Sequence, residues 1–322
     1  MLCSTAFTAG PRPGPLTSEN ASEETVIAAG QTVTERTSEA TTFRVRERTR
    51  EIVAHREILV NLIRKELKVK YAASILGAVW SVLNPVVFLA VFSFVVVVLG
   101  NNIPHYPVFL LSGLLAWNLF SVALGQGARS VVDNANLVKK VSFPREILPL
   151  SVVGVTLVDF ALQSSVFLLF ILATGYGFHV DVLILYPLAF AALLVFTVAM
   201  VFWISAVNVR YRDIGHLIGL ALLVWFWFTP IVYPGALVQQ ELTSFHGVNL
   251  WNWFLLNPLA GIIFGFQRAL YGASPAGSTV TPQVSALWTA GVLAAVIAAS
   301  LLLLYLTWRL YFRLSADFAE EL

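Results

Sequence analysis

Six long runs of predominantly apolar residues constrain the fold of this chain more than any other feature. A helix needs roughly 20 apolar residues to cross the hydrocarbon core of a bilayer. The runs are continuous rather than alternating, which excludes a β-barrel. They cover residues 79–99, 107–127, 150–174, 183–207, 214–233 and 286–308. The sequence therefore predicts an all-α integral membrane protein with six transmembrane helices.

The composition agrees with a membrane protein. Only 12% of the residues are charged, whereas soluble chains carry roughly a quarter. A fold so poor in charge could not cover its own surface in water. The single cysteine, Cys3, excludes a disulfide scaffold and a cysteine-based zinc cluster. The five histidines are scattered, with no pair at metal-ligand spacing, so no metal site is predicted.

Lysine and arginine are distributed unevenly around these runs. With a cytoplasmic amino terminus, 17 of the 20 lie on the cytoplasmic side next to, between or after the spans, two lie in the tail at 1–43, and only Arg268 lies outside. A seventh, weaker apolar segment, residues 250–271, is interrupted by proline and glycine. Counting it as a span would place Arg309 and Arg313 outside, so we interpret it as a short re-entrant helical segment before the last span. Both termini are then cytoplasmic, with a short tail at 314–322.

Two polar regions precede the first span. Residues 1–43 are rich in Ser, Thr, Glu, Pro and Gly and lack apolar residues at helical spacing, so we predict a disordered tail. Residues 44–74 contain nine Lys and Arg. Within them, residues 58–71 separate apolar residues from cations on opposite helical faces, which predicts an amphipathic interfacial helix at headgroup level. The six-span domain follows at 75–313.

The sequence lacks the motifs of the common enzyme classes. It has no Gly-x-x-x-x-Gly-Lys-Ser/Thr loop for nucleotide and no Gly-x-Ser-x-Gly or paired acidic motif. We therefore predict that the chain is not an enzyme, with no catalytic residue. The acidic residue near the centre of a span, Asp159, is costly there, and Gln163 is its candidate partner one turn away. A hydrogen bond that fixes helix packing and a role in ion transport both remain open for Asp159.

Three further segments stand out. They are residues 71–85 (YAASILGAVWSVLNP), residues 134–149 (NANLVKKVSFPREILP), and residues 208–213 (NVRYRD) followed by 225–234 (WFWFTPIVYP). In this order and with this topology, they resemble the permease subunits of type-2 ABC exporters of polysaccharide, the family that handles O-antigen, teichoic acid and capsule. The resemblance extends from about residue 55 to the carboxyl end.

The resemblance implies a function and a set of partners. Family members work as two permeases with two copies of a separate ATPase, so we expect a homodimer in the cytoplasmic (inner) membrane, with no cofactor in this chain and with ATP and magnesium on the partner. The expected cargo is a polyprenyl-linked polysaccharide, and the other expected contacts are membrane lipids, not nucleic acid. Arginine outnumbers lysine 15 to 5, as in proteins from GC-rich genomes, which points to an actinobacterial polymer such as galactan.

Two other functions are compatible with the sequence. An ABC permease for a lipid or a drug would have the same fold and a different cargo. An ion-coupled secondary transporter would use Asp159 instead of a separate ATPase.

The loop at 134–149 resembles the family's coupling helix, which docks on the ATPase. An apolar surface beside charged residues suits a helix that sits in a partner's groove. A solvated cytoplasmic loop would explain the cations but not Phe143. The expected coupling residues are Leu137, Val138, Lys139, Lys140, Phe143, Pro144, Arg145 and Glu146.

The basic helix resembles the family's entrance helix. Its cations would attract the pyrophosphate of a polyprenyl-linked donor or bind lipid headgroups, and these roles are not exclusive. The expected entrance residues are Arg64, Lys65, Lys68 and Lys70.

The family also suggests that aromatic residues line the translocation path, because sugar rings stack on aromatic faces. The expected channel-lining residues are Phe88, Phe92, Trp225 and Trp227. An interfacial aromatic belt is the alternative for tryptophans in these spans.

Overall fold

The computed structural model describes residues 44–72, 77, 79–98, 103–177, 181–211, 213–244, 249–272, 280–316 and 318–321. These residues belong to one compact unit, and their secondary structure is entirely helical. The predicted tail at 1–43 lies outside the described residues, as do parts of the first and third sequence motifs, including residues 73–76 and Arg212.

Five of the six predicted spans are helices long and apolar enough to cross a membrane. Their bounds agree with the apolar runs to within a few residues at most ends, and three helices extend beyond the runs into polar sequence at the carboxyl end. They are α4 (Val79–Val98), α5 (Tyr106–Asp133), α7 (Ile147–Thr174), α8 (Val182–Arg210) and α13 (Ala286–Ser315).

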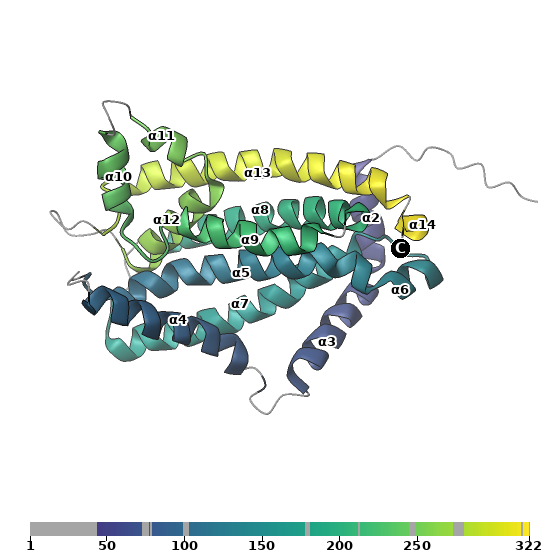
Figure 1. The fold of residues 1–322 in the computed structure, drawn as a ribbon, viewed down its shortest axis with the longest axis horizontal. Helices are drawn as coiled ribbons and strands as arrows, with labels where there is room; N and C mark the ends of the chain where they lie inside the picture. The colour runs from purple at the N-terminus through teal and green to yellow at the C-terminus, as the bar shows by residue number, and fades with distance from the viewer. Residues whose placement is uncertain are drawn as a thin grey trace, which may run out of the picture. The chain divides into compact units, whose positions relative to one another are not determined.

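The fifth predicted span differs from the other five. Helix α9 (Ile214–Trp227) has 14 residues, which corresponds to about 21 Å of helix and is less than the hydrocarbon thickness of about 30 Å. The predicted span continued to Tyr233, but the chain leaves the helical conformation after Phe228, ahead of Pro230. Proline disfavours a helical conformation in the residue before it, which explains the early end. Helix α9 nevertheless runs beside α5 (Figure 1).

The core of the bundle is built around α5 and α8. Helix α8 packs against α5, α12 and α13, and α5 also packs against α7. Small residues allow these close approaches: an added Cβ at Gly127 of α5 would lie 2.7 Å from Val201 of α8. Helix α4 is much more peripheral, since only Ser81 and Pro85 are buried.

Between α9 and α13, the described residues form three short helices. They are α10 (Gly235–Thr243), α11 (Trp251–Phe254) and α12 (Pro258–Leu270), and they occupy one end of the bundle (Figure 1). The side chain of Asn257 caps α12 by accepting from the Leu259 N–H, and Pro258 takes the first turn, where its missing donor costs nothing. Most of α12 is buried. Residues 250–271 therefore form two helices in place of one span.

Residues 44–72 form two helices, α2 (Val45–Ala54) and α3 (Arg56–Ala72). Helix α3 is inclined to the bundle (Figure 1) and packs along the first half of α7. Gly154 of α7 makes this packing possible, because a Cβ there would collide with Ile63 of α3. Part of the apolar face of α3, which predicted an interfacial helix, therefore packs against α7.

At the end of the bundle opposite α10–α12, a second hydrophobic cluster joins the short helices α6 (Ala135–Lys140) and α14 (Phe318–Glu321) to the long ones. Val138, Tyr311 and Phe318 are among its buried residues. The predicted carboxyl-terminal tail therefore contributes a buried side chain, Phe318, which is 1% exposed.

Candidate functional site

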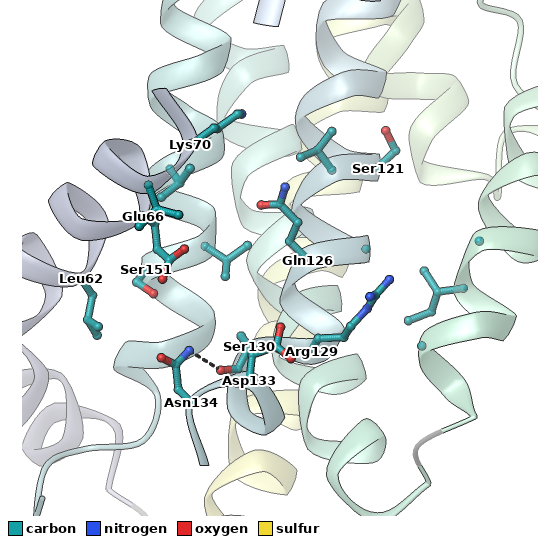
Figure 2. Close-up of a pocket in the computed structure, with 18 of the residues that line it drawn as sticks. Leu62, Glu66, Lys70, Ser121, Gln126, Arg129, Ser130, Asp133, Asn134 and Ser151 are labelled. Atoms are coloured by element: carbon teal, nitrogen blue, oxygen red, sulfur yellow. Dashed lines mark hydrogen bonds between the residues drawn. The ribbon is translucent and has the colours of Figure 1, made fainter. Parts of the chain in front are cut away.

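A cavity of about 640 Å³ opens between α3, α5, α7 and α9. Its walls combine apolar residues with an unusual number of polar ones for helices of this composition. Figure 2 shows Lys70 toward one end of this cavity and Asn134 toward the other. The polar and charged lining residues are Glu66, Lys70, Ser121, Gln126, Arg129, Ser130, Asp133, Asn134 and Ser151. We call this space the entrance cavity.

Helix α5 supplies one polar wall of the entrance cavity. Val122, Gln126, Arg129 and Asp133 follow one another at intervals of three or four residues, so they share one helical face. Gly215 of α9 stands opposite, with Arg129 within 4.0 Å of the position of an added Cβ. A side chain there would narrow the cavity.

Only one of the four predicted entrance cations lines the entrance cavity. Lys70 does so, whereas Arg64, Lys65 and Lys68 are exposed and are not part of its wall. The Lys65 ammonium lies 3.6 Å from the Glu66 carboxylate. The apolar face of α3 turns toward α7, which directs most of its cations away from the bundle.

The carboxylate of Asp159 is held by three side chains from α3 and α4. Lys70 Nζ lies 2.5 Å from Asp159 Oδ2, the Tyr71 hydroxyl donates to Oδ1, and the Ser81 hydroxyl donates to Oδ1 over 3.2 Å. Burial and the bond to Asp159 raise the pKa of Tyr71, so the phenol remains a donor at neutral pH. Asp159 is 6% exposed, and these bonds compensate for its desolvation.

The prediction that Gln163 partners Asp159 is wrong. Gln163 Oε1 instead accepts from Asn118 Nδ2 of α5 over 3.3 Å. Asp159 lies 12 residues into α7, about 18 Å along the helix, and the end of α3 reaches it there. A sequence motif on α7 alone could not reveal a partner that is 89 residues away in the chain.

The structure separates the predicted aromatic residues into two groups. Phe88 and Phe92 of α4 stack with centroids 5.9 Å apart, and Trp227 of α9 lies 6.3 Å from Phe92. Phe226, which is 7% exposed, completes this group. Trp225 points elsewhere: its indole N–H donates to Asn257 Oδ1 over 2.9 Å.

The predicted coupling segment also divides into exposed and buried residues. Lys139 and Lys140 are exposed at the end of α6, whereas Val138 is 6% exposed and Pro144 is buried. Leu137 and Phe143 pack against the second hydrophobic cluster. The apolar side chains expected to face a partner therefore contact their own chain to a large extent.

Glu146 is fully buried, which is incompatible with direct contact to a docked partner. Its Oε1 lies 3.3 Å from Arg48 Nε of α2 and 3.4 Å from Trp308 Nε1 of α13. The neighbouring Arg145 carbonyl accepts from the Tyr311 hydroxyl over 2.9 Å. These contacts make Glu146 an internal anchor between α2, α7 and α13.

Several residues of the entrance cavity were absent from the predicted site. Gln126, Arg129 and Asp133 are the clearest examples. Their helical spacing, at and just beyond the end of the apolar run at 107–127, is visible in the sequence. That signal indicates a polar stripe, but only the packing of α3 and α9 against α5 shows that the stripe borders a cavity.

Comparison with known proteins gives consistent similarities. Residues 58–271 match the family described as ABC-2 type transporter. The chain is 35% identical over 251 residues to the O-antigen export system permease protein RfbA of Myxococcus xanthus, covering 75% of this chain and 92% of that protein. It is 28% identical over 247 residues to the RfbA permease protein of Klebsiella pneumoniae, covering 76% and 90% respectively.

Proposed function

The chain belongs to the ABC-2 type transporter family, and from this premise we propose that it is the membrane-spanning permease subunit of an ATP-driven exporter of a polyprenyl-linked polysaccharide. Its similarity to O-antigen export permeases over three-quarters of its length supports the class of cargo. Galactan is the specific polymer that we propose, on the arginine excess of the sequence. We place the exporter in the cytoplasmic membrane as a homodimer with both termini inside.

The observation that carries this proposal is the entrance cavity. Arg129 and Asp133 are the charged residues of α5, and both line the cavity. The basic helix α3 adds Glu66 and Lys70, whose ammonium is paired with Asp159. Polar groups in a membrane protein lie where they face a cavity or one another. A mixed polar lining suits a cargo that carries both a phosphate group and hydroxyl groups.

Coupling to a separate ATPase would use the exposed part of the segment around α6. Lys139 and Lys140 project from the surface, while Val138, Phe143 and Glu146 fix the segment to the second hydrophobic cluster. A rigid attachment of this kind would transmit a displacement of α6 to α7 and α13. We therefore propose the two lysines as the docking residues and the buried residues as the mechanical link.

The aromatic group on α4 and α9 would form part of the translocation path. Phe88, Phe92 and Phe226 lie within ring-contact distance of one another, and Trp227 contacts Phe92 and Phe226. Aromatic faces bind sugar rings without strong directional bonds, so they allow a polymer to slide. Trp225, whose indole is bonded to Asn257, is not part of this proposal.

Ion-coupled transport through Asp159 is the less favoured alternative. The carboxylate is already engaged by Lys70, Tyr71 and Ser81, so it is held as an ion pair. We propose that it positions the end of α3.

The test is export of the polymer in a strain of the source organism that lacks this chain. We expect lipid-linked polymer to accumulate inside the cells, and plasmid-borne wild type to restore surface polymer. The Lys139→Glu and Lys140→Glu double variant should insert normally but fail to restore export, whereas Arg46→Glu, at an exposed cation of α2 with no assigned role, serves as the control. Normal surface polymer in the strain lacking the chain would refute the proposal.

A further inference from the structure

A second, smaller cavity of about 230 Å³ adjoins the entrance cavity. The two share Lys70, Val122 and Gln126 as lining residues. The smaller one lies between α4, α5 and α7, on the side where Lys70 meets Asp159. It is bordered by four amide side chains, Asn84, Asn118, Gln126 and Gln163, and we call it the amide cavity.

Of the four amides, Asn118 is 9% exposed and Gln163 is half-buried, whereas Asn84 and Gln126 are exposed. Each primary amide has two N–H donors and one carbonyl acceptor, and an unpaired amide in apolar surroundings is strongly unfavourable. Within the described residues, one hydrogen bond satisfies a member of this set from within, from Asn118 Nδ2 to Gln163 Oε1. The Asn118 carbonyl, the Gln163 amino group, and the side chains of Asn84 and Gln126 therefore remain available to a ligand.

The available groups identify the chemistry of that ligand. A hydroxyl group both donates and accepts, as an amide does, so a polyhydroxylated molecule can satisfy several amides together. An anion would require cations, and the ammonium of Lys70 is already bonded to the Asp159 carboxylate. The ligand should therefore be uncharged and rich in hydroxyl groups.

The apolar walls and the volume of the amide cavity further limit which ligands can bind there. Trp80 and Phe160 present aromatic side chains to the cavity, and ligand sites typically combine such apolar walls with a few polar groups that fix orientation. Drug-sized ligands occupy cavities of about 300–1,000 Å³. A cavity of about 230 Å³ is below that range and suits one sugar ring better than a longer segment of polymer.

We propose that the amide cavity binds a single neutral pyranose unit of the cargo, oriented by Asn84, Asn118, Gln126 and Gln163. This inference rests on the proposed function, because it assumes a polysaccharide cargo. It adds a specificity site beside the entrance cavity. A sugar at this position would lie next to the Lys70–Asp159 pair, at the junction of the two cavities.

The experiment measures access to the amide cavity in the purified full-length chain in lipid nanodiscs. The only native cysteine is replaced by Cys3→Ser, and Val122→Cys, on the wall shared by both cavities, provides the reporter. A small neutral methanethiosulfonate reagent labels it. D-galactose, D-glucose, D-mannose and L-rhamnose are added separately, with glycerol at equal osmolality as the control.

We expect at least one of these sugars to slow labelling about fivefold or more, with little effect of glycerol. Replacing both bonded amides together, by Asn118→Leu with Gln163→Leu, should abolish the protection. Removing both partners leaves neither one unsatisfied, so folding should be retained. Ser165→Leu, on the exposed side of α7 outside the amide cavity, should keep the protection.

Three results would overturn the inference. They are absence of labelling without sugar, equal slowing by glycerol, and no protection by any of the four sugars. Protection that survives the double substitution would equally contradict the role of the amides. The export assay separates this outcome from failure of the proposed function: if export requires the chain but sugars give no protection, only the amide cavity is refuted.

Discussion

Two buried carboxylates, Glu146 immediately before α7 and Asp159 within it, have different surroundings. Each pairs with a cation from the amino-terminal helices, Arg48 of α2 for Glu146 and Lys70 of α3 for Asp159. Glu146 is enclosed by the second hydrophobic cluster and is fully buried. Asp159 borders the amide cavity, and its lysine is 34% exposed.

The difference shows that burial of an ion pair does not by itself indicate its role. A carboxylate surrounded by packed side chains has no room for a ligand, and its removal leaves the paired cation buried without a partner. A carboxylate on a cavity wall can exchange its partners with water or cargo. We therefore expect Glu146 to matter mainly for stability and Asp159 mainly for transport.

The largest expected effect on stability is that of Glu146→Ala. Breaking a buried pair by removing one partner costs about 3–5 kcal/mol, and we expect about 3 kcal/mol because Arg48 is 20% exposed. Chemical unfolding in detergent measures the change. Glu51→Ala is the control, because Glu51 contacts the same arginine but is 43% exposed, and exposed pairs contribute about 0–1 kcal/mol.

An intermediate effect is expected for Gly154→Val, which separates α3 from α7 without altering either carboxylate. The new side chain would collide with Ile63, and overpacking typically costs about 1–3 kcal/mol. Export should fall because Lys70 can no longer reach Asp159. Gly291→Ala, in α13 and outside both cavities, has open space around its added Cβ and should have little effect in the same assays.

A smaller stability effect is expected for Lys70→Gln and Asp159→Asn. Hydrogen bonds between membrane helices contribute about 0.6 kcal/mol on average, so a double-mutant cycle should give a coupling energy of about 1 kcal/mol. Export should nevertheless fall severely in both single variants. If Asp159→Asn destabilises the protein more than Glu146→Ala, or leaves export intact, the contrast between the two carboxylates is wrong.

The smallest stability effect is expected for Lys139→Glu with Lys140→Glu. Both side chains are exposed, so unfolding should change by less than about 0.5 kcal/mol per site. Co-purification with the ATPase should be lost if these lysines dock it. If the double variant still associates with the ATPase, the docking surface lies elsewhere than on α6.

Much of the fold could be predicted because span length and charge distribution are local properties. The apolar runs identified α4, α5, α7, α8 and α13 with bounds close to those observed. The end of α9 was harder to predict from hydropathy, because the run stays apolar through Ile231-Val232-Tyr233. The conformational restriction before Pro230, rather than hydropathy, ends the helix there.

The candidate site could be predicted only in part. Lys70 and Asp159 were recognised as separate features, one on a basic helix and one in a span. Their pairing depends on α3 packing along α7 through Gly154, which no local pattern encodes. The coupling segment is a second example. The sequence predicts that Val138 and Phe143 face a partner, but in the folded chain they pack in the second hydrophobic cluster.

The sequence by itself determined that this chain is a helical membrane protein, which stretches form its long helices, and which family it resembles. The first two properties follow from hydropathy and charge summed over short segments, and the family resemblance follows from the three sequence motifs. Only the tertiary structure decided which polar residues meet, because amides and charges in a membrane are satisfied by neighbours from other helices. That requirement brings Lys70 to Asp159 and leaves Asn84 and Gln126 facing a cavity.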